Sequence, residues 1–335
     1  MTLTSIGDLA QNTYLFTRGA QLKQNVQNLQ QELSTGKTHD VTNRLGGNFN
    51  YLSDIERSIT RLESFKTITS ETALFADSTQ GYLSKITDIS SAYGEDLMTV
   101  GTFITEDSAD QLSHQARDYL EQTIASLNGQ LGGRSLFAGT DTDATPLADV
   151  DTMMTALSAE VAGLTDAGDI VQAVHDWFDD PAGFDTVIYQ GSTTSMGAVR
   201  IGPDEEVNIA LRADDDAFKQ AMAGFAIGAL ASEPGLSYTV DQKKDLLTSA
   251  SGEMMTTRGQ LVSVQAALGF TEERIADTVA RNAASLTSLQ LAKNELIQAD
   301  PYETVTRLEE AEFQLESIYT VTARSSKLSL LNYMS

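Results

Sequence analysis

The sequence predicts a mainly α-helical protein in which both chain ends build one coiled-coil helical rod, with a small α+β domain inserted between them. Three observations lead to this prediction: heptad-like apolar spacing near both ends, proline almost confined to the middle, and few aromatic residues. Aromatic residues make up 7% of the 335 residues and hydrophobic residues 41%. Such a composition favours helices that pack through narrow seams over a thick globular core.

The first expected helix covers residues 5–33. Its apolar residues follow one another at steps of four, three and four, which is the spacing of a coiled-coil seam. Gly36 stands where the C-cap of such a helix is expected. The residues of this seam are Leu22, Val26, Leu29 and Leu33.

Two more long helices are expected over residues 48–98 and 106–129. The seam of the first begins with large apolar residues (Leu52, Ile55, Ile59, Leu62) and continues with weaker ones. The second carries Leu112, Tyr119, Leu120, Ile124 and Leu127, and it should end at Asn128-Gly129.

A heptad repeat in residues 241–299 is the clearest pattern in the chain. Six residues recur at intervals of seven, which predicts one long helix with a constant contact face. They are Leu261, Leu268, Ile275, Asn282, Leu289 and Leu296. Their d-like partners are small or polar, so an isolated two-stranded zipper is not expected, and Asn282 is predicted to fix the register. These partners are Val264, Thr271, Thr278, Ser285, Ala292 and Ala299.

The last helix is expected to begin at Pro301, because the residue before a proline disfavours the helical region and Pro suits the first helical position. Its contact face comprises Val305, Leu308, Ala311, Leu315, Ile318 and Thr322, with Leu328 and Leu331 near its end.

The middle of the chain differs in kind, since it holds every proline except Pro301. Short strands are expected over 186–190, 198–201 and 207–211, and a helix after the acidic run Asp214-Asp215-Asp216. The predicted division is therefore a terminal helix (1–40), the two parts of the helical rod (41–138 and 236–299), the inserted domain (139–235) and a last helix (300–335).

Composition excludes several kinds of protein. Acidic residues number 47 against 22 basic ones, for a formal charge of −25, so nucleic-acid binding is not expected. Cysteine is absent, which excludes disulfides and thiolate chemistry. No cleavable signal peptide is recognised, and the longest apolar run, 217–230, is too short to cross a bilayer.

No catalytic, cofactor-binding or metal-binding residue is predicted. His39, His114 and His175 are not spaced as ligands, and residues 129–135 (GQLGGRS) fit a chain reversal better than a phosphate loop. Asp141 and Asp143 resemble the start of a calcium loop, but its glycine and glutamate positions are not filled. Trp177 is expected in the core.

Six segments stand out in this order along the chain: Gln31–Lys37 (QELSTGK), Leu127–Thr140 (LNGQLGGRSLFAGT), Tyr189–Gly191, Val199–Gly202, Ala213–Phe218 and Asp300–Tyr333. Together they resemble the bacterial flagellin family, and most of all its flagellin-like hook-associated proteins, which join hook and filament. Two departures from filament flagellin favour the junction proteins: residues 37–43 read KTHDVTN, and the C-terminus lacks repeated Leu and Arg.

The resemblance implies a structural adaptor, not an enzyme, with the terminal helices poorly ordered until they pack in the assembled flagellum. We expect the packing residues to be Leu22, Val26, Leu29, Leu33, Leu308, Leu315, Ile318, Leu328 and Leu331. The implied partners are further copies, the hook-side junction protein, flagellin and an export chaperone. The implied location is the extracellular hook–filament junction, reached by type III export. A filament flagellin, and a secreted enzyme or binding module carried by 140–235, remain as alternatives.

Overall fold

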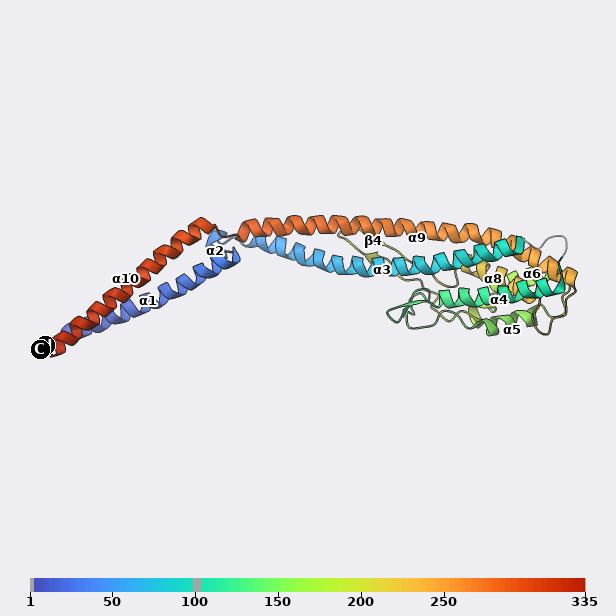
Figure 1. Cartoon of the computed structure of the whole chain (residues 1–335), viewed down its shortest axis with the longest axis horizontal. Helices are drawn as coiled ribbons and strands as arrows, with labels where there is room; N and C mark the ends of the chain where they lie inside the picture. Colours follow the sequence, from blue (N-terminus) through green and yellow to red (C-terminus); the bar gives the residue numbers. More distant parts are fainter. Residues whose placement is uncertain (1–2, 99–103, 335) are drawn as a thin grey trace. The chain divides into compact units, whose positions relative to one another are not determined.

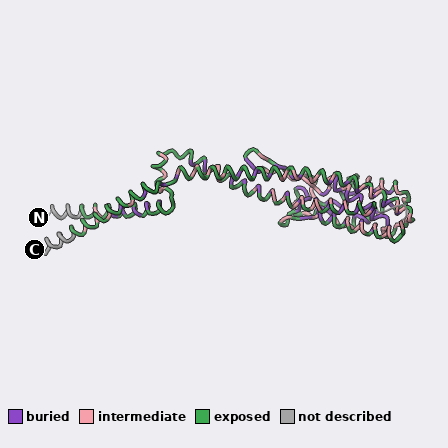
Figure 2. The backbone as a smooth tube through the Cα atoms, turned by 45° about the horizontal axis from the view of Figure 1, so that its top comes forward, coloured by how far each residue is buried: buried purple, intermediate pink, exposed green. Residues whose placement is uncertain are grey.

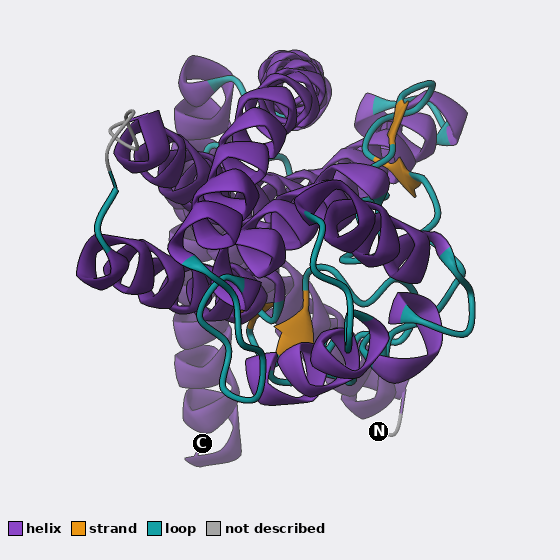
Figure 3. Cartoon of the chain, turned by 90° about the vertical axis from the view of Figure 1, so that its right-hand side faces the viewer, coloured by secondary structure: helices purple, strands orange, loops and turns teal. Residues whose placement is uncertain are grey.

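The computed structural model describes the backbone of residues 3–98 and 104–334, and the side chains of 10–98 and 104–324. The chain forms two compact units. The first comprises Met1–Glu63 with Ala283–Ser335, and the second comprises Ser64–Asn282. Helix predominates, with two small two-stranded sheets beside it, as the sequence predicts (Figures 1 and 3).

The helices are α1 (Leu3–Thr35), α2 (Val41–Arg44), α3 (Asn50–Met98), α4 (Glu106–Leu127), α5 (Val150–Glu160), α6 (Ala167–Asp179), α7 (Phe184–Val187), α8 (Asp216–Leu230), α9 (Val240–Ile297) and α10 (Pro301–Met334). The strands are β1 (Gln130–Leu131), β2 (Arg134–Ser135), β3 (Val199–Arg200) and β4 (Glu206–Val207). The long helices α1, α3, α4, α9 and α10 begin and end close to the predicted boundaries.

In the first unit, α1 and α10 lie side by side (Figure 1). Exposed residues outnumber buried ones along this pair (Figure 2). The same unit contains the beginning of α3 and the end of α9, where Lys293 Nζ forms an ion pair with Glu56 Oε1 at 2.8 Å.

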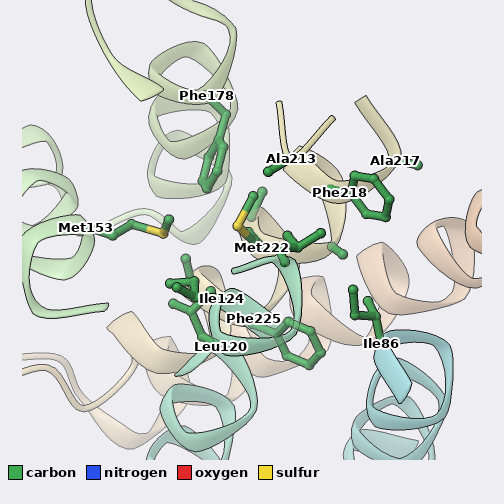
Figure 4. Packing of buried hydrophobic residues seen from close by; sticks show 14 of the residues in the cluster. Ile86, Leu120, Ile124, Met153, Phe178, Ala213, Ala217, Phe218, Met222 and Phe225 are labelled. Atoms are coloured by element: carbon green, nitrogen blue, oxygen red, sulfur yellow. The ribbon is translucent and has the colours of Figure 1, made fainter. Parts of the chain in front are cut away.

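Helix α8 lies at the centre of the second unit. Asp215 precedes the helix and Asp216 is its first residue, where an acidic side chain complements the helix dipole. The residues that follow are mostly apolar. Twelve of its residues are buried, so helices cover it on nearly every side. Figure 4 shows Phe218, Met222 and Phe225 of α8 among side chains from α3, α4, α5 and α6. Trp177 is buried in the same core, as expected.

The heptad repeat of α9 meets α3 within the second unit. Leu261, Leu268 and Ile275 are 0–4% exposed, which confirms the predicted contact face. Gln265 Nε2 donates to Ser84 Oγ of α3 at 3.2 Å. Asn282 differs from the prediction, because its amide bonds to the carbonyl oxygen of Ile201 at 3.0 Å and not to a facing helix.

The part of α3 that belongs to the second unit is rich in hydroxyl groups. The hydroxyls of Thr69, Thr72, Thr79, Thr87 and Ser90 each donate to the carbonyl four residues earlier in the same helix. All of them except Thr87 are buried. The helix therefore satisfies these hydroxyls by itself.

The predicted strands of the middle region are partly wrong. Residues 186–190 do not form a strand: α7 occupies their start, with Gly183 accepting its first bonds and Thr186 Oγ1 donating to Pro181 O at 2.6 Å. Only Tyr189 makes a β-bridge, to Leu147. The other two predicted strands shorten to the antiparallel pair β3–β4. Helices α5 and α6 are additional to the prediction.

The glycine-rich residues 129–135 form a chain reversal, as predicted. Strands β1 and β2 pair antiparallel, with Gln130 opposite Ser135 and Leu131 opposite Arg134. Gly132 and Gly133 connect them at φ 59° and 82°. Positive φ at both central residues is the requirement of a tight hairpin turn, which explains the two glycines.

Two segments that carry the family resemblance, 127–140 and 213–218, meet residues 193–194 at one place in the second unit. The guanidinium of Arg212 makes two 2.7 Å hydrogen bonds with the Asp214 carboxylate and also donates to Thr193 O. Thr140 N donates to Thr194 O at 3.0 Å. A Cβ on Gly139 (φ 63°) would lie 2.5 Å from the same oxygen, so this crossing requires glycine.

Candidate packing surface

The two terminal helices meet along a thin apolar seam. Leu22, Val26 and Leu29 of α1 are 5–9% exposed, and Val26 and Leu29 cluster with Ala311 of α10. Leu308 packs against this cluster, while Leu315 and Ile318 are half-buried. A Cβ on Gly19 would lie 3.7 Å from Ile318 Cγ2, so a residue without a side chain brings the helices together there.

Backbone hydrogen bonds tie the end of α1 to the start of α10. Gly36 ends α1 at φ 65°, as predicted, and its carbonyl accepts from Ala299 N at 2.9 Å. Thr38 N donates to Ile297 O at 2.8 Å. Asp300 then caps α10, since its Oδ1 accepts from Tyr302 N at 2.9 Å. This junction sets which faces of the two helices meet.

Two predicted seam residues are not buried by the seam: Val305 of α10, which is 38% exposed, and Leu33. Leu33 is 43% exposed near the end of α1, while Glu32 is 9% exposed and accepts hydrogen bonds from His39 N and Thr38 Oγ1. The carboxylate therefore closes the seam in place of a fourth leucine. The side chains of Leu328 and Leu331 lie outside the described residues.

Large apolar side chains remain exposed on both helices. Two of them, Tyr302 (88% exposed) and Phe313 (72%), are eleven residues apart on α10, so they lie on one face. At 3.6 residues per turn that face is opposite Ala311 and the seam. Among the residues whose side chains are described, the others on these helices are Tyr14, Phe16, Leu33, Val305, Tyr319 and Val321. Spacing alone could have revealed the pair Tyr302 and Phe313.

The outer side of α10 is also acidic. Glu303, Glu309, Glu312 and Glu316 are all exposed, and Arg307 pairs with Glu303. A polar groove between the helices is lined by Asn25, Asn28, Glu32, His39, Arg307 and Glu310, among others. The surface thus combines aromatic side chains with a negative field, an arrangement suited to packing against a complementary protein surface.

In the described part of the chain, no group of three or more His, Asp or Glu side chains is placed to hold a metal ion. His175 Nε2 lies 3.1 Å from Glu253 Oε1 in the second unit, whereas His39 belongs to the first unit. Among the described helices, none has the length and apolarity needed to cross a membrane.

Parts of the chain are similar to known proteins. Residues 253–334 match the bacterial flagellin C-terminal helical region, which confirms the predicted resemblance for α10 and much of α9. A solved structure from Vibrio parahaemolyticus, described as a flagellar hook-associated protein, matches with a TM-score of 0.52 and 10% identity. The match covers 75% of this chain and 99% of that one, and it shows a shared fold. No curated protein sequence shows a significant match to this chain.

Proposed function

We propose that this chain is a structural subunit of the bacterial flagellum that joins the hook to the filament by subunit packing, without catalysis. The observation that carries the proposal is the helix pair α1–α10, in which a thin seam leaves Tyr302 and Phe313 facing outward. The flagellin match over residues 253–334 and the shared fold with a hook-associated protein support it.

The packing surface has two parts with different tasks. Leu22, Val26, Leu29, Leu308, Leu315 and Ile318 hold α1 and α10 together, and Leu328 and Leu331 continue the predicted set toward the C-terminus. Leu33 and the exposed aromatic residues contact neighbouring copies. Burial of an exposed aromatic side chain contributes about 1.5–3 kcal/mol, so several per copy can drive assembly. Because the contacts join unlike patches, the copies form a layer and not a closed pair.

The rest of the chain supports this layer. In the proposal, residues 139–235 face outward, and the helices of 41–138 and 236–299 connect them to the inner packing surface. The partners are further copies, the hook-side junction protein and flagellin, and an export chaperone covers α10 before assembly. The location is the outside of the cell, at the hook–filament junction.

A filament flagellin is the second candidate, and the match of residues 253–334 to a flagellin region favours it. Seeding separates the two. A flagellin extends filament fragments without limit, whereas a junction protein adds one thin layer and stops.

A deletion strain tests the proposal. We expect electron microscopy to show hooks without filaments, and flagellin to accumulate in the growth medium. Filaments that are lost while the junction stays intact would favour flagellin. Normal flagella would refute both candidates.

A further inference from the structure

Residues 199–211, here called the strap, form the β3–β4 hairpin and the segment that follows it, and they lie along α9 within the second unit. The turn between β3 and β4 lies against residues 274–282, and residues 208–211 lie against 264–271. Ile201, Val207 and Ile209 are 0%, 1% and 8% exposed, and all three belong to the core of the unit.

The strap explains the small d-like residues of α9. A Cβ on Gly202 would lie 3.3 Å from Thr278 Cγ2, so the backbone of the strap approaches the helix closely at that threonine. Farther along, Val264 and Thr271 line a groove together with Ile209 and Leu211. A large side chain at these helix positions would push the strap away.

Polar contacts hold the tip of the strap. Asn282 Nδ2 donates to Ile201 O at 3.0 Å, and Arg274 Nη2 donates to Glu205 Oε1 at 2.7 Å and to Glu206 O at 2.9 Å. Arg281 lies 3.7 Å from the same Glu205 carboxylate. These contacts together are called the latch. Their hydrogen bonds lower the pKa of Glu205, mainly through Arg274.

The base of the strap is fixed independently of its tip. Arg212, directly after the strap, donates to Thr193 O and lies 3.4 Å from Ser195 Oγ. These contacts bring together the two ends of the loop formed by residues 193–212. Gly197, between that base and β3, has open space around it. A loop with a closed base and a separate tip can detach without disturbing the helices beneath it.

The strap is less tightly enclosed than α8. One groove separates it from α3, where Ile68 and Phe75 face Val199 and Val207, and a second groove flanks it on α9 near Val264. Helix α8, in contrast, is buried on nearly every side. Local opening is therefore favoured at the strap over the α4–α8 core.

We propose that the strap is a movable segment: it opens as a unit about its Arg212 base when the latch contacts of Asn282, Arg274 and Glu205 are released, and opening uncovers the α9 face around Thr278. This inference depends on the second unit alone and not on the proposed function. A flagellar deletion phenotype therefore neither supports nor weakens it.

Amide hydrogen exchange of the full chain, read peptide by peptide, tests the latch. In Asn282→Ala we expect exchange over residues 199–207 to become about tenfold faster, because a buried carbonyl loses its donor. Exchange in α4 and α8 should stay as in the parent. Lys293→Gln is the matched control on α9: it removes the ion pair with Glu56 in the first unit and should leave the strap unchanged.

A second variant pair keeps the test independent of Asn282. Glu205→Lys should speed exchange of the strap, since it faces Arg274 and Arg281, and adding Arg274→Glu should restore protection. The proposal is overturned if neither Asn282→Ala nor Glu205→Lys changes exchange over 199–207. It is equally overturned if exchange rises by the same factor in α8, because the strap would then open only with the whole unit.

Discussion

The hydroxyl group of Tyr93 lies directly over Gly228, so a Cβ on Gly228 would stand 2.1 Å from Tyr93 Oη. Tyr93 is fully buried between Tyr119 and Phe225, with ring centroids 5.8 and 5.5 Å away. Its hydroxyl has no hydrogen-bond partner among the described residues, and burial raises the pKa of Tyr93 far above the ordinary value. Helix α8 thus approaches α3 at a residue without a side chain.

The first prediction follows from this contact. Gly228→Ala should lower the free energy of unfolding of the second unit by about 1–3 kcal/mol, because the added methyl group overpacks the core. Tyr93→Phe alone should be neutral or stabilising by about 1 kcal/mol, since it removes an unpaired buried hydroxyl. Denaturation followed by Trp177 fluorescence measures both.

The double variant completes that experiment. With Tyr93→Phe present, Gly228→Ala should cost less than it does alone, because the nearest atom has gone. Equal costs in the two backgrounds would contradict the contact.

The second prediction concerns Arg212. Its side chain is 20% exposed and that of Asp214 10% exposed, so Arg212→Ala leaves a buried carboxylate without its cation. We expect a loss of about 3 kcal/mol in unfolding free energy. Arg212→Lys should recover only part of it, because lysine cannot make the two parallel bonds. Full recovery by lysine would show that charge alone matters there.

The third prediction is a pH dependence in the second unit. The hydrogen bond from Lys243, followed by that from Ser232, lowers the pKa of Asp110 below its ordinary 3.8. Because the folded-state pKa is the lower one, this stabilisation is present above about pH 4 and is lost as the pH falls through the folded-state value. Lys243→Met should therefore be clearly less stable than the parent at pH 7.

At pH 3 and below, the difference between Lys243→Met and the parent should shrink as Asp110 becomes protonated. Chemical denaturation across this range measures it. Arg57→Met serves as the control, since Arg57 and Asp54 form an exposed pair that contributes little. A difference that stays constant with pH would contradict the assignment to Asp110.

The fourth prediction separates assembly from folding. Phe313→Ser should leave the helix content of the monomer unchanged, because Phe313 is 72% exposed, but should raise the concentration needed for assembly about tenfold or more. Leu29→Ala, in the seam, should instead reduce the protection of α1 and α10 in the monomer, at a cost of about 2–4 kcal/mol. Circular dichroism, limited proteolysis and sedimentation distinguish the two. Unimpaired assembly of Phe313→Ser would count against the outward aromatic face.

Periodic patterns made the long helices predictable, whereas pairings between distant residues did not follow from sequence. The seven-residue spacing of Leu261, Leu268 and Ile275 predicted the face of α9 that is buried. The role of Asn282 could not be predicted, because its partner is 81 residues away and is a backbone carbonyl. The strand expected over 186–190 failed for a local reason: β propensity competed with the turn around Pro181 and Gly183.

The candidate surface was predictable only in part. Spacing identified Leu22, Val26 and Leu29, but it could not show that Glu32 would close the seam in place of Leu33. That exchange depends on the chain folding back at Gly36 to bring the His39 backbone to the carboxylate.

The hydroxyls of α3 have a consequence for how the second unit tolerates movement. Since Thr69, Thr79 and Ser90 donate to carbonyls of their own helix, they need no hydrogen-bond acceptor from α9. Because these hydroxyl bonds stay within α3, a small axial shift of α9 would break none of them. The hydrogen bond between Gln265 and Ser84 does cross the interface. The position of α9 along α3 therefore depends on such single contacts more than on the length of the interface.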